Sequence, residues 1–192
     1  MIKILQTGQA GSTRTLVDMH RVRTKIFRDR MGWDVDVNAM ELEVDDYDLT
    51  ETLPVPLSST MCETSRFGVH SETKDRAERQ KQVNLATAEM IVALIDTCIL
   101  CGITDMYTLY NVKIKRLLER IGFKPAEISA VIDLEGEPTV TARFDMNKAL
   151  LDAVRASTGV TLKIHPEDLP PLLVEKYLMH VRPEEFHERR VA

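Results

Sequence analysis

A stripe of apolar residues in the middle of the chain constrains the fold more than any other feature. Its members recur every three or four positions, at Leu85, Ala88, Val92, Ile95 and Ile99. Gly102 follows where a helix of this kind would end. A helix with one continuous apolar face must bury that face against another element. We therefore expect a core helix here, preceded by the charged stretch 75–82.

Strand and helix patterns alternate after this helix. The expected elements are a strand at 106–110, a helix capped by Asn111, a strand or hairpin at 131–144, and a helix capped by Asp145. Such alternation is typical of a layered α/β sandwich. In the first half, we expect a helix from Ser12 or Thr13 to Met31 and a strand at 65–70.

The length of 192 residues suits one well-buried core. We expect one domain over 1–159 and a C-terminal appendage over 160–192, with a helix near 172–179. The longest apolar stretch, 90–101, is interrupted by polar residues and is too short to span a bilayer. The first residues do not resemble a secretory signal, so we expect a cytoplasmic protein. A net charge of −5 argues against a nucleic-acid partner.

Cysteines and histidines give no sign of a metal or redox site. Cys98 and Cys101 form a C-x-x-C inside the apolar helical pattern, where we expect them to be small buried residues. Cys62 is the one cysteine close to candidate chemistry. The five histidines lack the short spacings of metal ligands, and no glycine-rich loop suited to phosphate is present.

A motif near position 65 suggests a function. Residues 63–67 read Glu-Thr-Ser-Arg-Phe, and upstream of them lies a spaced set: Arg23, Phe27, Trp33, Glu43, Asp45, Tyr47 and Asp48. Read together, these residues resemble the N-terminal half of the acyl-homoserine-lactone synthases, the autoinducer-making enzymes of bacterial quorum sensing. The resemblance implies a three-layer αβα sandwich of the acetyltransferase-like fold. It also implies acyl transfer from an acyl carrier protein to S-adenosylmethionine, a substrate and not a cofactor, followed by lactone closure.

The resemblance assigns the residues of the catalytic motif. Glu63 matches the candidate general base, which would take the proton of the attacking amine, and Ser65 and Arg66 complete the motif. On a strand, Glu63 and Ser65 would share one face while Arg66 points to the other. Arg66 is then as suited to organising carboxylates as to direct catalysis. A surface glutamate beside a strand is the alternative for Glu63.

The upstream set corresponds to the S-adenosylmethionine pocket. Asp45 and Asp48 match an acidic pair that orients the substrate, with Arg23 as their partner. Phe27 and Trp33 match aromatic positions that can accept a sulfonium, or they are core aromatics. The remaining loop carboxylates are expected to be solvated: Glu41, Glu43 and Asp46.

The second half of the chain would bind the acyl donor. Thr108 matches a residue of the acyl pocket, and Tyr110 shares its face and could shorten the pocket. Acidic carrier proteins need a basic docking surface, which this region supplies at Lys113, Lys115, Arg116, Arg120 and Lys124. A solvated helix face is the alternative for this basic set.

The chain departs from the family between the two motifs. Residues 49–60 stand where the family has several strands and an Arg-x-Leu-Pro-Thr segment, so part of the central sheet is expected to be missing. Two other functions therefore remain open. One is an acetyltransferase-like N-acyltransferase that uses acyl-coenzyme A, and the other is an inactive relative that binds without turnover.

Overall fold

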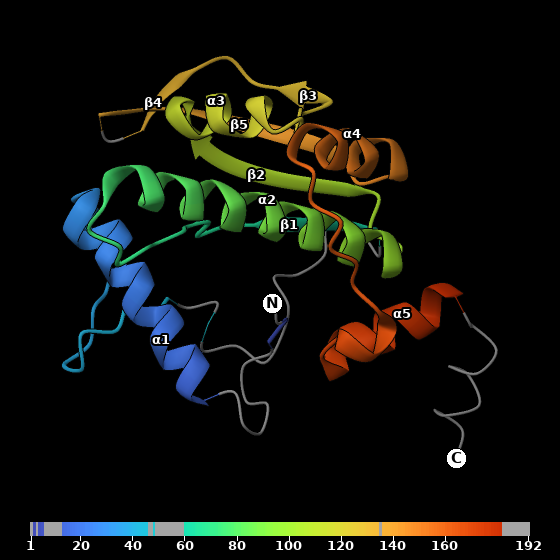
Figure 1. Ribbon diagram of the computed structural model, residues 1–192, viewed down its shortest axis with the longest axis horizontal. Helices are drawn as coiled ribbons and strands as arrows, with labels where there is room; N and C mark the ends of the chain where they lie inside the picture. The colour runs from blue at the N-terminus through green and yellow to red at the C-terminus, as the bar shows by residue number, and fades with distance from the viewer. Residues whose placement is uncertain are drawn as a thin grey trace.

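In the computed structural model, residues 2, 4–5, 13–45, 48, 60–134 and 136–181 are described. They form an α/β fold with helices packed on a mixed sheet (Figure 1). The helices are α1 (Thr13–Thr24), the π-helix η1 (Lys25–Arg30), α2 (Arg76–Leu100), α3 (Val112–Arg120), α4 (Lys148–Thr158), the 3₁₀ turn η2 (Pro166–Asp168) and α5 (Pro171–Val181). The strands are β1 (Met61–Thr64), β2 (Asp105–Asn111), β3 (Glu127–Ile128), β4 (Ile132–Leu134) and β5 (Glu137–Asp145).

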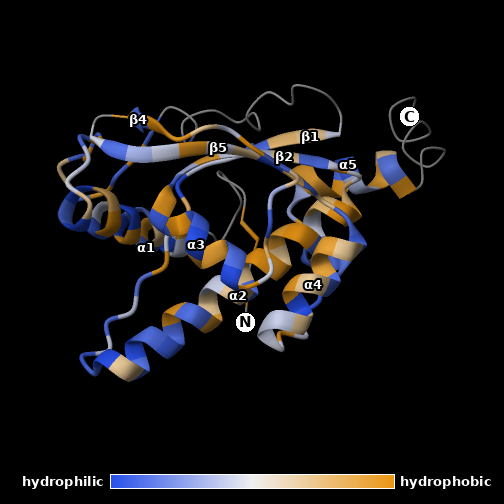
Figure 2. Ribbon diagram, turned by 90° about the horizontal axis from the view of Figure 1, so that it is seen from above, coloured by the Kyte–Doolittle hydropathy of each residue, from blue (hydrophilic) through white to orange (hydrophobic). Residues whose placement is uncertain are grey.

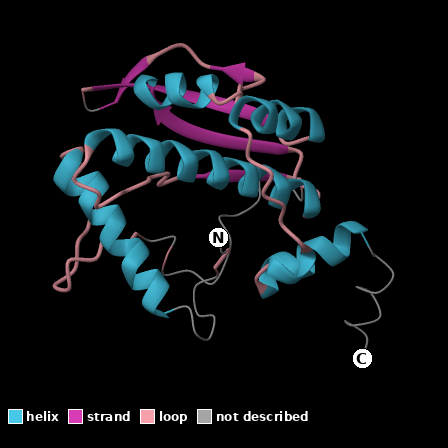
Figure 3. Ribbon diagram, in the orientation of Figure 1, coloured by secondary structure: helices cyan, strands magenta, loops and turns pink. Residues whose placement is uncertain are grey.

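The sheet has the order β1-β2-β5-β3, and β4 also pairs with β5 (Figure 3). β1 and β2 are parallel, whereas β2, β3 and β4 pair antiparallel with β5. The β1–β2 register ends at Thr64 opposite Thr108, but β2 continues to Asn111. The last residues of β2 thus extend beyond the end of β1, and among the described residues β1 pairs with β2 alone.

Helices α2 and α4 cover one face of the sheet and form the core with it (Figure 2). Val92 and Ile95 on α2 are fully buried, as is Phe144 on β5. Phe123 stacks on Phe144 with ring centroids 4.1 Å apart, which joins the end of α3 to the sheet. The apolar stripe of α2 is therefore confirmed in its central part. Leu85 is an exception, because it lies before the buried section and is 52% exposed.

Side-chain caps mark where helices α3 and α4 begin. The Asn111 side chain accepts a hydrogen bond from Ile114 N at 3.0 Å and begins α3, as predicted. For α4 the predicted cap Asp145 is wrong, since Asn147 accepts from Leu150 N at 3.0 Å. Asp145 is the last residue of β5, where it pairs with Arg143. α2 begins at Arg76, so it includes most of the charged stretch expected to precede it.

The strand predicted at 65–70 is wrong. The strand lies earlier, at Met61–Thr64, and Arg66 adopts φ 56°, a left-handed conformation that ends extended pairing. Gly68 then passes so close to η1 that a Cβ atom would lie 2.7 Å from Ile26 Cδ1. A side chain here would require the end of the buried Ile26 side chain to shift, so glycine suits the close approach of this segment to the N-terminal helix.

The residues that follow α4 contribute to the core. Val160, Ile164 and Leu169 are 4 to 7% exposed, and Ile164 N donates to Asp96 Oδ2 at 2.7 Å. α5 covers the predicted helix near 172–179. The boundary between a domain and an appendage at residue 160 stays a prediction. By length and composition alone, α2 could cross a membrane. However, 44% of its most apolar stretch is buried inside the protein, as in a core helix.

Candidate active site

Arg23 lies at the centre of a cluster of ion pairs. It is 7% exposed and comes from the last turn of α1. Its Nη1 donates to both carboxylate oxygens of Asp48 at 2.8 and 2.9 Å, and its Nη2 donates to Asp45 Oδ2 at 3.0 Å. Its Nε pairs with Glu43. The predicted pairing of Arg23 with Asp45 and Asp48 is present in the structure.

Arg66 joins the same cluster from the other side. Its Nε lies 3.2 Å from Glu43 Oε1 and 3.3 Å from Asp45 Oδ2. The left-handed backbone at Arg66 turns this side chain toward the carboxylates. Of the two roles that the sequence leaves open for Arg66, the geometry shows contact with carboxylates.

The prediction that Glu43 is solvated is wrong. Its side chain is 1% exposed and contacts both Arg23 and Arg66. Its backbone N–H donates to the Thr24 hydroxyl at 2.8 Å, and its carbonyl accepts from His20 Nδ1 at 2.7 Å. With its backbone held by two residues of α1, the Glu43 carboxylate is buried between Arg23 and Arg66. Glu41 is exposed as expected and pairs with Arg28.

The charges of the cluster, which we call the arginine–carboxylate cluster, do not cancel. It contains Arg23, Arg66, Glu43, Asp45 and Asp48. Two guanidinium groups against three carboxylates leave a formal charge of −1. Burial would raise the pKa of Asp45, but the charge of Arg23, hydrogen bonds with Asp48 and the charge of Arg66 lower it overall. The lowered pKa keeps Asp45 ionised, and the formal negative charge makes the cluster suited to a cationic ligand.

An aromatic pair adjoins this cluster through Phe27. Phe27 and Trp33 stack with ring centroids 5.1 Å apart and planes 20° from parallel. Arg66 Cζ lies 5.5 Å from the centroid of Phe27. Phe27 is 3% exposed, whereas Trp33 is 36% exposed. Phe27 is thus a core aromatic, and Trp33 is the ring that remains accessible to a ligand.

Glu63 and Ser65 are exposed. Glu63 lies on β1 opposite Tyr107 of β2, and Ser65 follows the end of the strand, one residue before Arg66. Within the motif, Arg66 makes the contact with the arginine–carboxylate cluster that the structure shows. It leaves the Glu63 carboxylate accessible to solvent.

Thr108 and Tyr110 share one face of β2 with the buried Met106, so they lie on the core-facing side of the strand. The Thr108 hydroxyl donates to the carbonyl of Thr64 at 3.0 Å, which ties β2 to the last residue of β1. The Tyr110 ring packs against the core, 6.4 Å from Phe144 between centroids. Burial, with a smaller effect from Glu119, raises the pKa of Tyr110 to about 12.

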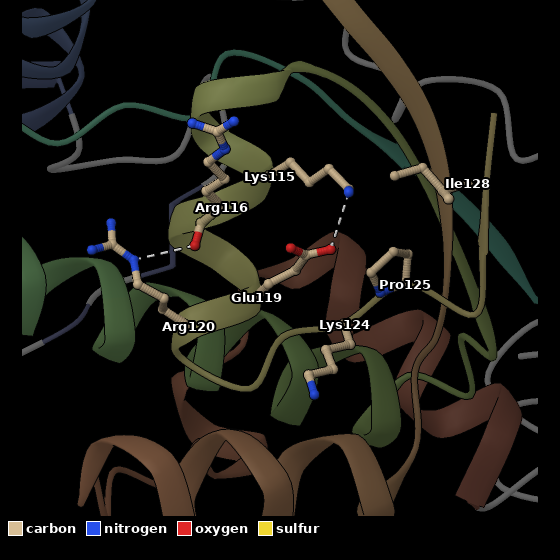
Figure 4. A pocket seen from close by; sticks show the side chains of 7 residues that line it. All are labelled: Lys115, Arg116, Glu119, Arg120, Lys124, Pro125 and Ile128. Carbon is tan, nitrogen blue, oxygen red and sulfur yellow. Dashed lines mark hydrogen bonds and ion pairs between the residues drawn. The ribbon is translucent and has the colours of Figure 1, made fainter. Parts of the chain in front are cut away.

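The predicted basic residues surround an open depression on α3 (Figure 4). The depression has a volume of about 950 Å³. Its lining consists of Lys115, Arg116, Glu119, Arg120, Lys124, Pro125 and Ile128. Lys115 pairs with Glu119 at 3.4 Å, while Lys113 belongs to the same helix but not to the lining. The basic residues are therefore gathered at one surface next to the end of β2.

The structure adds one relationship that the sequence did not suggest. The largest effect on the pKa of Cys62 on β1 comes from Cys98 on α2, the first cysteine of the C-x-x-C. Hydrogen bonding from Cys98 and the charge of Lys176 outweigh burial and lower the pKa of Cys62. Within the described ranges, no group of three or more His, Cys, Asp or Glu side chains could hold a metal ion. Asp46, Tyr47 and most of the shortened segment 49–60 lie outside the described residues.

Known proteins resemble this chain in sequence. The profile described as "Autoinducer synthase" matches residues 49–154. An acyl-homoserine-lactone synthase of Agrobacterium fabrum is 26% identical over 179 positions, which cover 74% of this chain and 81% of that protein. One of Rhizobium etli is 27% identical, covering 67% and 77%. The alignment with the Agrobacterium protein spans 179 positions but covers only about 142 residues of this chain, which is 74% of 192. Some residues of that protein therefore have no counterpart in this chain.

Solved structures resemble the fold. The AHL synthase LasI matches with a TM-score of 0.57 at 21% identity, covering 80% of this chain and 92% of that one. The CoA-dependent acyl-homoserine lactone synthase BjaI, solved with SAM and isopentyl-CoA, matches with a TM-score of 0.66 at 16% identity, covering 91% and 97%. These likenesses show the acetyltransferase-like fold, and the sequence profile matches more than half of the chain. The chain therefore belongs to the autoinducer synthase family and is an acyltransferase.

Proposed function

We propose that this enzyme transfers an acyl group to the amine of S-adenosylmethionine and then closes the product to an acyl-homoserine lactone. In the first step a nitrogen–carbon bond forms at the thioester carbonyl, and the thiol of the donor leaves. In the second step the substrate's own carboxylate attacks the carbon next to the sulfonium. The carbon–sulfur bond breaks, and neutral methylthioadenosine is released.

The observation that supports this proposal best is the arginine–carboxylate cluster beside Trp33. S-adenosylmethionine carries a sulfonium and an amine, which are both cationic at neutral pH, and a carboxylate. The cluster offers a formal charge of −1 for the cations and the partly exposed guanidinium group of Arg66 for the carboxylate. The exposed face of Trp33 can accept the sulfonium by a cation–π contact. These are the complementary groups for that substrate.

Glu63 is the proposed general base. The attacking amine has an ordinary pKa near ~8, so it is mostly protonated at neutral pH and must lose a proton to react. The Glu63 carboxylate is exposed on the strand that leads into Arg66, and it can take this proton directly or through a water. This first proton is released to solvent, and the second proton, which the nitrogen loses as the amide forms, goes to the departing thiolate.

An acyl carrier protein is the proposed donor. Carrier proteins are acidic, and four cationic side chains line the depression on α3: Lys115, Arg116, Arg120 and Lys124. The depression lies beside the end of β2, near the proposed acyl pocket. An acyl-coenzyme A donor is the second candidate, since its phosphates would also find cations at this surface.

The test is an incubation of the purified protein with S-adenosylmethionine and matched acyl-carrier-protein and acyl-CoA donors. Mass spectrometry would follow acyl-homoserine lactone and methylthioadenosine. Both products should appear together, and Glu63→Gln should abolish them while its circular dichroism stays unchanged. An acylated amine without methylthioadenosine would point to a different N-acyltransferase. Binding of S-adenosylmethionine with neither product would show an inactive relative.

A further inference from the structure

We infer that Cys62 and Cys98 form a reversible oxidation site, at which a hydroperoxide converts the two thiols to a disulfide that joins β1 to α2 and restrains the strand carrying Glu63. All three cysteines of the chain are free thiols in the structure. Cys62 is partly exposed, whereas Cys98 and Cys101 are each 2% exposed. A reachable thiol with a second thiol behind it suits reversible oxidation.

The register of β1 directs the Cys62 side chain toward the helices. Cys62 pairs with Met106 of β2, which is 1% exposed and belongs to the core. Two residues further along β1, the Thr64 hydroxyl donates to Met106 Sδ at 3.7 Å, so alternate side chains of β1 lie on the core side. Cys62 accordingly packs against the core, while Glu63 points to the opposite face of the sheet.

Backbone hydrogen bonds fix the end of α2 beside the start of β1. The Cys98 carbonyl accepts from Ile103 N at 2.8 Å, and Thr104 N donates to the carbonyl of Thr60 at 2.8 Å. Thr60 directly precedes β1 and lies two residues before Cys62. The two cysteines therefore lie on neighbouring elements at the same end of the sheet, and hydrogen bonding between their thiols is the largest effect on the pKa of each.

The thiols differ in the way that the reaction requires. Hydrogen bonding from Cys98 and the charge of Lys176 lower the pKa of Cys62 against the effect of burial, so Cys62 is the better nucleophile toward a peroxide. Hydrogen bonding with Cys62 and burial raise the pKa of Cys98, which therefore stays a thiol. Cys101 is engaged elsewhere, since its Sγ donates to the Leu173 carbonyl at 3.6 Å.

The oxidation proceeds in two steps. The Cys62 thiolate attacks one oxygen of the hydroperoxide, the O–O bond breaks, and Cys62 becomes a sulfenic acid while the leaving oxygen takes up the proton that the thiol lost. The Cys98 sulfur then attacks the sulfenic sulfur, the S–S bond forms and the S–O bond breaks. The leaving hydroxide takes the Cys98 proton and departs as water. Each thiol loses one electron, and the peroxide gains both.

The disulfide changes the strand next to the proposed general base. Glu63 directly follows Cys62 on β1. A covalent bond draws the two sulfurs closer than a hydrogen bond holds them, so β1 is pulled toward α2. This effect on turnover rests on the proposed function, whereas formation of the disulfide does not.

The test is peroxide treatment of the purified protein, followed by alkylation of the remaining thiols and peptide mapping without reductant. Trypsin releases peptide 31–66 with Cys62 and peptide 82–113 with both Cys98 and Cys101. Wild type and Cys101→Ala should give the two peptides joined. Cys98→Ala should lose the joined pair and accumulate at Cys62 a sulfenic acid that dimedone traps. Oxidised wild type without the joined pair, or Cys98→Ala that still forms it, would overturn the inference.

A second measurement follows lactone formation during the same treatment. Loss of activity in wild type should match the fraction of joined peptides, and dithiothreitol should restore it. Unchanged activity in fully joined protein would overturn the restraint on Glu63. If the reduced protein makes no lactone, the proposed function fails, while peptide mapping still decides whether the disulfide forms.

Discussion

Glu43 and Arg23 form an ion pair whose carboxylate is 1% exposed. The same carboxylate is contacted by Arg66, which follows β1. One side chain thus connects the N-terminal helix, the loop after it and the strand that carries Glu63. Because such a carboxylate has no access to water, the two arginines are what compensates its burial.

Removing this carboxylate should destabilise the fold. Glu43→Ala leaves two guanidinium groups short of a partner, and breaking a buried pair costs about 3–5 kcal/mol. Urea unfolding should show a lower midpoint with an unchanged slope. Glu41→Ala is the matched control, because Glu41 is an exposed partner of Arg28 and its loss should change stability by less than about 0.5 kcal/mol. Equal effects of the two variants would rule out a structural role for the buried pair.

The local part of the fold could be predicted from the sequence. The spacing of Val92 and Ile95 and the cap at Asn111 act within a few residues, so pattern alone was sufficient. Two nearby polar residues could both cap α4, and the sequence favoured Asp145 where Asn147 does so. The prediction that Leu85 is buried is wrong, because the apolar stripe extends beyond the part of α2 that other elements cover.

The long-range part of the site could not be predicted. The burial of Glu43 depends on Thr24 and His20 of α1 and on Arg66, which are 19 to 23 positions away in either direction. No spacing rule links residues at such separations. The family resemblance gave the pairing of Arg23 with Asp45 and Asp48, but not the left-handed backbone that turns Arg66 toward them.

Stability should fall in acid through Asp45. Arg23, Asp48 and Arg66 outweigh the effect of burial and lower its pKa in the folded protein, whereas the unfolded chain keeps an ordinary value near ~3.9. The stabilisation is therefore fully present above the unfolded pKa and is lost as pH falls through the folded pKa. The difference in unfolding free energy between wild type and Asp45→Asn should be constant from about pH 7 to 5 and shrink below about pH 4.

Asp34→Asn serves as the control for that series, because Asp34 is exposed on the same loop. A difference that stays constant down to about pH 2 for Asp45→Asn would contradict the assignment of the acid response to Asp45.

Trp33 should contribute to binding of S-adenosylmethionine. Its exposed ring stacks on Phe27, and a cation–π contact is worth about 0.5–2 kcal/mol. Trp33→Leu should therefore raise the KM for S-adenosylmethionine roughly 2- to 30-fold with a smaller effect on kcat. Trp33→Phe keeps an aromatic face and should restore most of the affinity. A Phe variant as weak as the Leu variant would show that packing, not the aromatic face, is what matters.

Cys62 should be the most reactive thiol of the protein. A hydrogen bond from Cys98 and the charge of Lys176 lower its pKa against the effect of burial, whereas burial raises the pKa of Cys101 to about 11. Alkylation requires the thiolate, so iodoacetamide should label Cys62 at lower pH than an ordinary cysteine. Peptide mass spectrometry between about pH 6 and 9 should show Cys62 modified well before Cys98 or Cys101.

Cys98→Ala removes the hydrogen bond and should shift labelling of Cys62 to higher pH. If that variant reacts with the pH dependence of wild type, the Cys98 contact does not set the reactivity of Cys62.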